Sequence, residues 1–375
     1  MMINAAPLFQ PFRIGRLDLR NRIVMAPMTR SFSPGGVPGV NVAAYYRRRA
    51  EHEVGLIITE GTVIGHPAAG NDPNVPYFHG AEALAGWARV VAEVHAGGGR
   101  IIPQLWHVGS MRRQGDLPNV EVPPASPSGL FKPGKKVAEA IPAREVEALI
   151  SAFATSAAHA HRLGFDGIEI HGAHGYLIDQ FFWSGTNERD DAFGGGIAQR
   201  ARFAAEIVKA CRAATAPDFP IILRFSQWKQ QDYGAKLAQS PAELSTFLDP
   251  LVAAGVDVFH CSTRRFWEPE FPDVVEGGAA RMNLAGWTKT LSGRPVITVG
   301  SIGLETDFID AFRAKSVGTQ LEHFGRLVEM VSAGEVDLAA VGRALIADPA
   351  WAVKLREGKL DTFVPYSRET LTELV

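Results

Sequence analysis

Eight short runs of β-branched and apolar residues recur along the chain, each followed by a longer segment with helical periodicity. The runs begin at Ile23, Leu56, Arg100, Gly167, Pro220, Asp257, Pro295 and Leu338. Successive runs start 33 to 67 residues apart, a spacing typical of repeated strand–helix units. Eight such units predict an α/β fold, a single (β/α)8 TIM barrel that forms one domain over residues 1–375. A doubly wound sheet is the competing architecture, but no G-x-G-x-x-G motif follows the first run.

The segments between the runs carry helix start and stop signals. Ser240 and Glu243 form a capping box, and Gly255 ends the apolar periodicity that follows them. A barrel needs about 250 residues, so a chain of 375 has room for insertions. We therefore expect extended loops after strands 3, 4 and 6, at the carboxyl ends of the strands, where barrel enzymes carry their chemistry.

Composition limits the class of protein. A hydrophobic fraction of 46% excludes intrinsic disorder, and a net charge of −2 gives no support for a nucleic acid or an anionic membrane as partner. Cys211 and Cys261 are the two cysteines and form no C-x-x-C pair, which argues against disulfide, zinc and iron–sulfur scaffolds and fits a reducing compartment. No apolar run is long enough for a signal peptide or a membrane span. We expect a cytoplasmic monomer or homodimer that acts on a small molecule.

Two histidines and a tyrosine follow the predicted fourth strand. They lie within six residues, as His171, His174 and Tyr176, at the strand end that faces the mouth of a barrel. Together they offer hydrogen-bond donors and a proton donor. Alternatively, the histidines satisfy local backbone groups and the tyrosine packs in the loop. Their clustering at the catalytic face favours an active site.

Polar strand ends elsewhere indicate a bound anion. Gly300 and Ser301 follow strand 7, and Gly342 and Arg343 follow strand 8, the two loops that frequently form a phosphate site in barrels. Glycine at a strand end can also reflect turn geometry alone. Arg224 lies inside an apolar strand, so it should meet an anion, an electron-rich ligand or a salt-bridge partner on a neighbouring strand.

Other side chains would complete the rim of the mouth. The polar candidates are Thr29, Gln104 and His107. An apolar lining could come from Trp106, Phe181, Phe182, Trp183, Phe266 and Trp267. Because most aromatic residues belong to a core, only Trp106 and the loop residues among them are treated as site candidates.

Seven motifs in order resemble the Old Yellow Enzyme family of FMN-dependent NAD(P)H oxidoreductases, or ene-reductases. They are LRNRIVMAPMTR (19–30), TEGT (59–62), PQLWHVG (103–109), GFDGIEIHGAHGYLIDQF (164–181), RARF (200–203), VGS (299–301) and VGRALIADP (341–349). The family fold is a (β/α)8 barrel, in agreement with the periodicity. The chain departs from the usual family sequence at Asn71, where many members have an aromatic residue. The segments 226–233 and 261–271 look like those of a particular subgroup.

The resemblance implies noncovalent FMN, with NADPH or NADH as reductant. Pro27, Met28 and Thr29 would lie against the flavin ring, Gly61 and Gln104 at its pyrimidine side, and Arg224 near N1. Gly300, Ser301, Gly342 and Arg343 would hold the FMN phosphate.

The resemblance also implies roles toward a substrate, an α,β-unsaturated carbonyl or nitro compound whose C=C bond is reduced. His171 and His174 would bind the carbonyl oxygen beside Trp106, and Tyr176 would donate the proton. No residue is expected to bind a metal.

Four alternatives remain open at this point. The same barrel could act on quinones, nitro compounds or nitrate esters. It could be a dienoyl-CoA reductase or an amine dehydrogenase, but the cysteine cluster of those enzymes is missing. A metal-dependent hydrolase could use His107, His171 and His174, with Glu169 as an added ligand. A flavin- or phosphate-binding sensor would carry no catalysis.

Overall fold

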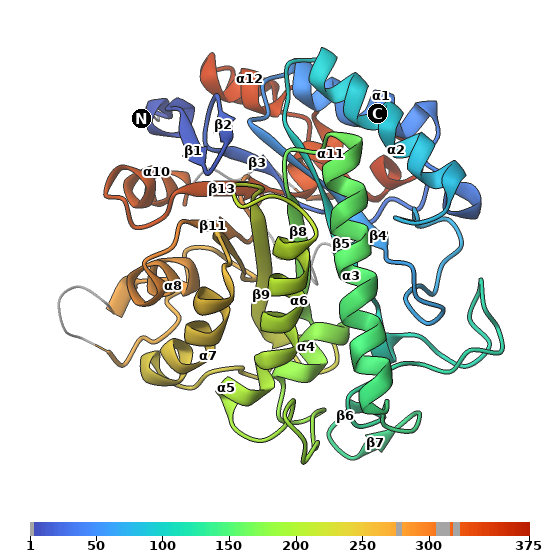
Figure 1. The fold of residues 1–375 in the computed structure, drawn as a ribbon. Coiled ribbons are helices and arrows are strands. Elements are labelled where there is room, and N and C mark those ends of the chain that lie inside the picture. Colours follow the sequence, from blue (N-terminus) through green and yellow to red (C-terminus); the bar gives the residue numbers. More distant parts are fainter. Residues whose placement is uncertain (1–3, 275–279, 305–315, 318–322) are drawn as a thin grey trace.

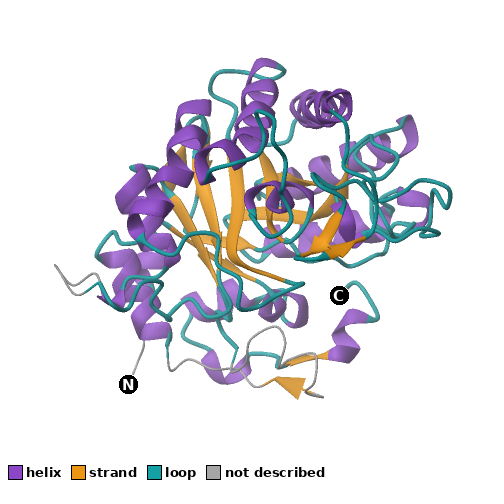
Figure 2. Cartoon of the chain, turned by 90° about the horizontal axis from the view of Figure 1, so that it is seen from below, coloured by secondary structure: helices purple, strands orange, loops and turns teal. Residues whose placement is uncertain are grey.

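Eight parallel strands close into a barrel that is surrounded by helices (Figures 1 and 2). The computed structural model describes residues 4–274, 280–304, 316–317 and 323–375. The barrel strands in order are β3 (Ile23–Met25), β4 (Leu56–Val63), β5 (Ile101–Trp106), β8 (Ile168–His174), β9 (Ile221–Lys229), β10 (Val258–Ser262), β11 (Val296–Val299) and β13 (Leu338–Val341). Each predicted run begins within one residue of one of these strands. The predicted (β/α)8 fold is therefore confirmed.

Helices follow the barrel strands and cover their outer faces. They are α1 (Val40–Glu51), α2 (Ala81–Ala96), α3 (Ala143–Leu163), α4 (Leu177–Phe182), α5 (Ile197–Arg200), α6 (Arg202–Ala213), α7 (Pro241–Ala254), α8 (Leu284–Ser292), α10 (Phe324–Ser332), α11 (Arg343–Ala347) and α12 (Trp351–Arg356). The predicted capping box begins α7, where the Ser240 hydroxyl accepts the Glu243 amide at 3.2 Å. Gly255 ends this helix in the left-handed region, at φ +100°. No helix within the described ranges is both long and apolar enough to cross a membrane.

In the described part of the chain, short strands outside the barrel form three pairs. Two of them are β6 (Leu130–Lys132) with β7 (Lys135–Lys136) and β12 (Ser316–Val317) with β14 (Tyr366–Ser367). The third is a hairpin of β1 (Phe12–Ile14) and β2 (Leu17–Leu19), whose apolar side chains join the cluster inside the barrel. That cluster includes residues at the starts of the barrel strands, such as Leu56 and Val258, so the hairpin closes the amino-terminal end.

Burial explains why the strand runs are so uniformly apolar. One cluster of side chains fills the barrel, and a larger one lies between the barrel and the helices. Strands of a parallel barrel are buried on both faces and therefore lose the alternation seen in half-exposed sheets. All eight residues of β4 are buried.

The carboxyl ends of the strands carry the long loops, as predicted for strands 3, 4 and 6. These segments are 107–142, which includes β6 and β7, 175–196, which includes α4, and 263–283, of which 275–279 lie outside the described ranges. Near the same end, the Arg30 guanidinium donates to the backbone oxygens of Thr370 (2.9 Å) and Glu373 (2.7 Å). The C-terminal segment is thereby fastened to the loop that follows β3.

Candidate active site

A cavity of about 490 Å³ opens at the carboxyl ends of the barrel strands. Every residue that the sequence assigned to cofactor, substrate or catalysis lines it: Pro27, Met28, Thr29, Gly61, Gln104, Trp106, His171, His174, Tyr176, Arg224, Gly300, Ser301, Gly342 and Arg343. These residues come from the ends of seven different strands. Their convergence follows from barrel closure, which brings all the strand ends to one rim.

His171 lies on β8 and presents a defined hydrogen-bonding face. The Ala173 amide donates to its Nδ1 at 3.2 Å, so Nδ1 is an acceptor and Nε2 carries the proton of the neutral ring. Burial and then the positive charge of Arg224 lower the pKa of His171 well below its usual range. The side chain is therefore a neutral N–H donor near neutral pH.

His174 ends β8 in an unusual backbone conformation. Its φ is +65°, a left-handed value that costs a non-glycine residue about 1–2 kcal/mol. Its ring lies 5.1 Å from that of His171, and its Nε2 is 2.8 Å from the Ser262 hydroxyl. Burial and the Arg224 charge also lower the pKa of His174 well below its usual range. Strained residues of this kind cluster at functional sites.

Tyr176 precedes α4 and lies against the His171 ring and the indole of Trp106. Its ring centroid is 5.0 Å from that of His171 and 4.9 Å from that of Trp106. Burial raises the pKa of Tyr176, while a hydrogen bond with Gln230 and the Arg224 charge act in the opposite direction. The cavity thus holds two neutral imidazoles beside a protonated phenol.

Arg224 is a buried cation on β9, in register with His171 on β8. Its Nη2 donates to the Ser262 hydroxyl at 3.2 Å, and its Nε has no hydrogen-bond partner among the described residues. The neighbouring carboxylate, Glu169, instead binds His260 (2.6 Å) and the Gln104 amide (2.7 Å). Within the described ranges Arg224 forms no ion pair, so the salt-bridge alternative is not realised. A buried cation of this kind fits an anionic or electron-rich ligand.

Two glycines of the cavity wall, one on β4 and one directly after β11, pack closely against other residues of the protein. A Cβ on Gly61 would lie 2.7 Å from the Trp106 ring, and one on Gly300 would lie 2.6 Å from the Thr263 hydroxyl. The loop after β3 is held by Glu60, whose carboxylate accepts the amides of Arg30 (2.8 Å) and Ser31 (3.1 Å). Burial raises the pKa of Glu60 to about 7.

These features fit FMN. The cavity lies in the size range of cofactor sites, and its buried guanidinium suits an electron-rich ring. Pro27, Met28, Thr29, Gly61, Gln104 and Arg224 would surround the ring, and Gly300, Ser301, Gly342 and Arg343 would hold the phosphate.

Several candidate residues lie outside the cavity. The Nε2 of His107 contacts the Nδ1 of His66 at 3.1 Å, so His107 does not join His171 and His174. The described residues contain no cluster of three or more His, Cys, Asp or Glu side chains suited to a metal. Phe181 and Phe182 are wrong as rim residues: they belong to the apolar core, where Phe181 stacks on Phe203 of α6 at 4.1 Å and Phe182 packs against Phe247 of α7 at 4.9 Å.

Other cavity residues were not singled out by sequence reasoning. They are Trp228, Gln230, Ser262, Thr263, Arg264 and Tyr366, among others. The Trp228 ring lies 4.7 Å from that of His174, and Tyr233 stacks on Trp228 at 5.6 Å. The unusual sequence of segment 226–233 was the available signal that Trp228 and Gln230 belong to the site. Tyr366 had none, because it reaches the cavity from a distant C-terminal segment.

A parallel eight-stranded barrel with a cavity at the carboxyl ends of its strands is the architecture of the barrel enzymes. Residues 7–362 match the sequence model of the NADH:flavin oxidoreductase / NADH oxidase family. The chain belongs to this family.

Two curated relatives illustrate the match. The protein named 12-oxophytodienoate reductase 7, from Oryza sativa subsp. japonica, is 41% identical over 226 residues, which are 57% of this chain and 57% of that protein. The NADH oxidase of Thermoanaerobacter brockii is 34% identical over 357 residues, or 94% of this chain and 51% of that protein. The chain therefore spans little more than half the length of these two relatives.

Solved structures agree with the family. Morphinone reductase in complex with tetrahydroNAD has a TM-score of 0.77 and 29% identity, over 98% of this chain and 97% of that one. The old yellow enzyme homologue from Zymomonas mobilis has a TM-score of 0.76 and 25% identity, over 98% and 99% of the two chains. The predicted Old Yellow Enzyme resemblance is confirmed.

Proposed function

We propose that the protein is an FMN-dependent NAD(P)H oxidoreductase that reduces the activated C=C bond of α,β-unsaturated carbonyl or nitro compounds. The observation that carries this proposal is the contact among His171, His174 and Tyr176 in the cavity that also holds the FMN candidates. Family membership and the morphinone reductase likeness support it.

The three side chains have complementary roles in this proposal. His171 and His174 donate hydrogen bonds to the substrate oxygen, which draws electron density away from the β-carbon and stabilises the developing enolate. When bound, FMN supplies the hydride that it has received from NAD(P)H. Tyr176 then gives its phenolic proton to the α-carbon, and its raised pKa keeps that proton in place until it is needed.

A substrate panel tests the function. Purified protein should be yellow, should bleach anaerobically with NADPH or NADH, and should regain its colour when an enone, a maleimide or a nitroalkene is added. Colourless protein would contradict the flavin assignment. A flavin that is reduced but never reoxidised by any activated alkene would point instead to a sensor.

Arg343→Ala should weaken FMN retention. Arg343 lines the cavity at the start of α11, where its guanidinium would form charge-assisted hydrogen bonds with the phosphate. The flavin-to-protein absorbance ratio after extensive dialysis measures the effect, with riboflavin binding as the control because it lacks the phosphate. Full FMN occupancy in the variant would contradict the phosphate site.

A further inference from the structure

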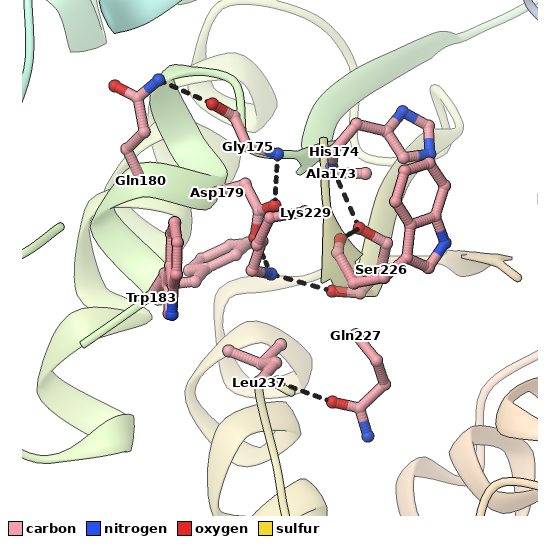
Figure 3. Close-up of polar contacts among 12 residues, drawn as sticks. Ala173, His174, Gly175, Asp179, Gln180, Trp183, Ser226, Gln227, Lys229 and Leu237 are labelled. Carbon is pink, nitrogen blue, oxygen red and sulfur yellow. Dashed lines mark hydrogen bonds and ion pairs between the residues drawn. The ribbon is translucent and has the colours of Figure 1, made fainter. Parts of the chain in front are cut away.

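A buried ion pair lies directly beneath the segment that carries His174 and Tyr176 (Figure 3). The Nζ of Lys229, at the end of β9, is 2.6 Å from an Asp179 carboxylate oxygen on α4. Both side chains are fully buried. Burial lowers the pKa of Lys229 and raises that of Asp179, and each charge opposes the shift of the other. Neither residue lines the cavity, so the proposed chemistry does not explain the pair.

The pair is bonded to the backbone on both sides. The second oxygen of Asp179 accepts the Gly175 amide at 2.6 Å, and Lys229 also donates to the Ser226 carbonyl at 3.1 Å. The Ser226 hydroxyl in turn accepts the His174 amide at 3.0 Å. Figure 3 shows these contacts as one connected set between β8, α4 and β9.

The turn held in this way is a demanding one. His174 (φ +65°) and Gly175 (φ +78°) are consecutive residues with left-handed backbone. Glycine adopts this conformation without cost, but His174 keeps it only where surrounding contacts over-determine it. A Cβ on Gly175 would lie 1.8 Å from the Gln231 amide oxygen, so the loop after β9 also presses against the turn.

We propose that Asp179 is a positioning residue: its side-chain oxygen accepts the Gly175 amide and so holds the 174–176 turn with the His174 ring and the Tyr176 phenol facing one substrate, while Lys229 compensates its buried charge. This inference rests on the proposed function, because phenol-type ligands report on the oxygen-binding donors. The decisive contact is the hydrogen bond that the Gly175 amide donates to the Asp179 carboxylate. Lys229 holds that carboxylate in place. The segment 226–233 thereby acquires a role in organising the site.

Two double variants separate this role from simple stability. Removing one member would strand a buried charge, so both are neutralised together. Lys229→Met with Asp179→Asn keeps an amide oxygen for the Gly175 N–H, whereas Lys229→Met with Asp179→Leu does not. We expect the Asn variant to bind 4-chlorophenol within about threefold of the wild type. The Leu variant should bind it about tenfold more weakly, as for the loss of one hydrogen bond. Titration of the flavin absorption band gives each affinity.

Controls separate failure of the inference from failure of the function. Lys289→Met removes a lysine whose partner Asp337, 2.8 Å away, lies outside the cavity, and it should leave phenol affinity unchanged. FMN content should be equal in all variants. If the Leu variant is insoluble, Asp179→Ala in the same background replaces it. Equal phenol affinity with and without the acceptor at position 179 would overturn the inference. A wild type that binds neither FMN nor phenol would overturn the proposed function instead.

Discussion

Tyr176→Phe should slow the reduction of simple enones by about 10²–10⁴-fold, the range for loss of a general acid. The phenol lies 5.0 Å, ring to ring, from His171 and is held protonated by its burial. Reduction of the flavin by NAD(P)H should be unchanged, because that step needs no proton from Tyr176. Stopped-flow measurement of the two half-reactions separates these effects.

Two comparisons sharpen this test. Nitroalkenes should suffer less than enones, since their nitronate products are stable without immediate protonation. Tyr45→Phe is the matched control, because the Tyr45 hydroxyl is buried without a hydrogen-bond partner among the described residues and lies outside the cavity. Unimpaired enone turnover in Tyr176→Phe would remove the proton-donor role.

His174→Ala should weaken the binding of phenol-type ligands by about 1.5–3 kcal/mol, the range for a hydrogen bond to a charged group. That loss corresponds to roughly ten- to a hundredfold in affinity. Enone reduction should slow as well, because the developing enolate loses one of its two donors. The flavin spectrum without ligand should hardly change, because other residues hold FMN. Phenol titrations of wild type, His171→Ala and His174→Ala measure the effect.

A structural histidine would behave in the opposite way. Its removal would lower the free energy of unfolding and the flavin content, while protein that still folds would bind phenol normally. His161→Ala provides this comparison, since His161 packs against Phe219 at 5.1 Å and lies outside the cavity. Unchanged phenol affinity in both His171→Ala and His174→Ala would mean that the oxygen-binding pair lies elsewhere.

The fold was predictable because its signal is local and repeated. Each barrel strand is buried on both faces, so it appears in the sequence as an uninterrupted apolar run, and eight such runs leave few other architectures. The hairpin of β1 and β2 was missed, since each of its strands has an exposed charged residue between two apolar ones and so forms no uninterrupted apolar run. Most segments of the site could also be predicted, because residues at the carboxyl ends of parallel barrel strands lie near one rim.

Contacts between distant segments were not predictable. The sequence predicted that Arg224 would meet an anion, an electron-rich ligand or a salt-bridge partner. Only the structure shows that the carboxylate of Glu169 is hydrogen-bonded to His260 and Gln104 instead. His107 matched the other histidines in type and place, yet its side chain turns toward His66. In both cases the outcome depends on which neighbour lies nearer in space, and sequence spacing does not encode that distance.

By itself, the sequence determined the barrel, its long loops and the residues that gather at its mouth, because strand order in a closed barrel places all carboxyl ends together. The tertiary structure decided how these residues are held. The Lys229–Asp179 pair joins side chains fifty positions apart, and Trp228 covers the His174 ring. The left-handed turn at His174 and Gly175 also emerged only in three dimensions. Such features depend on packing between elements, where burial forces charges to pair and neighbouring contacts sustain a strained backbone.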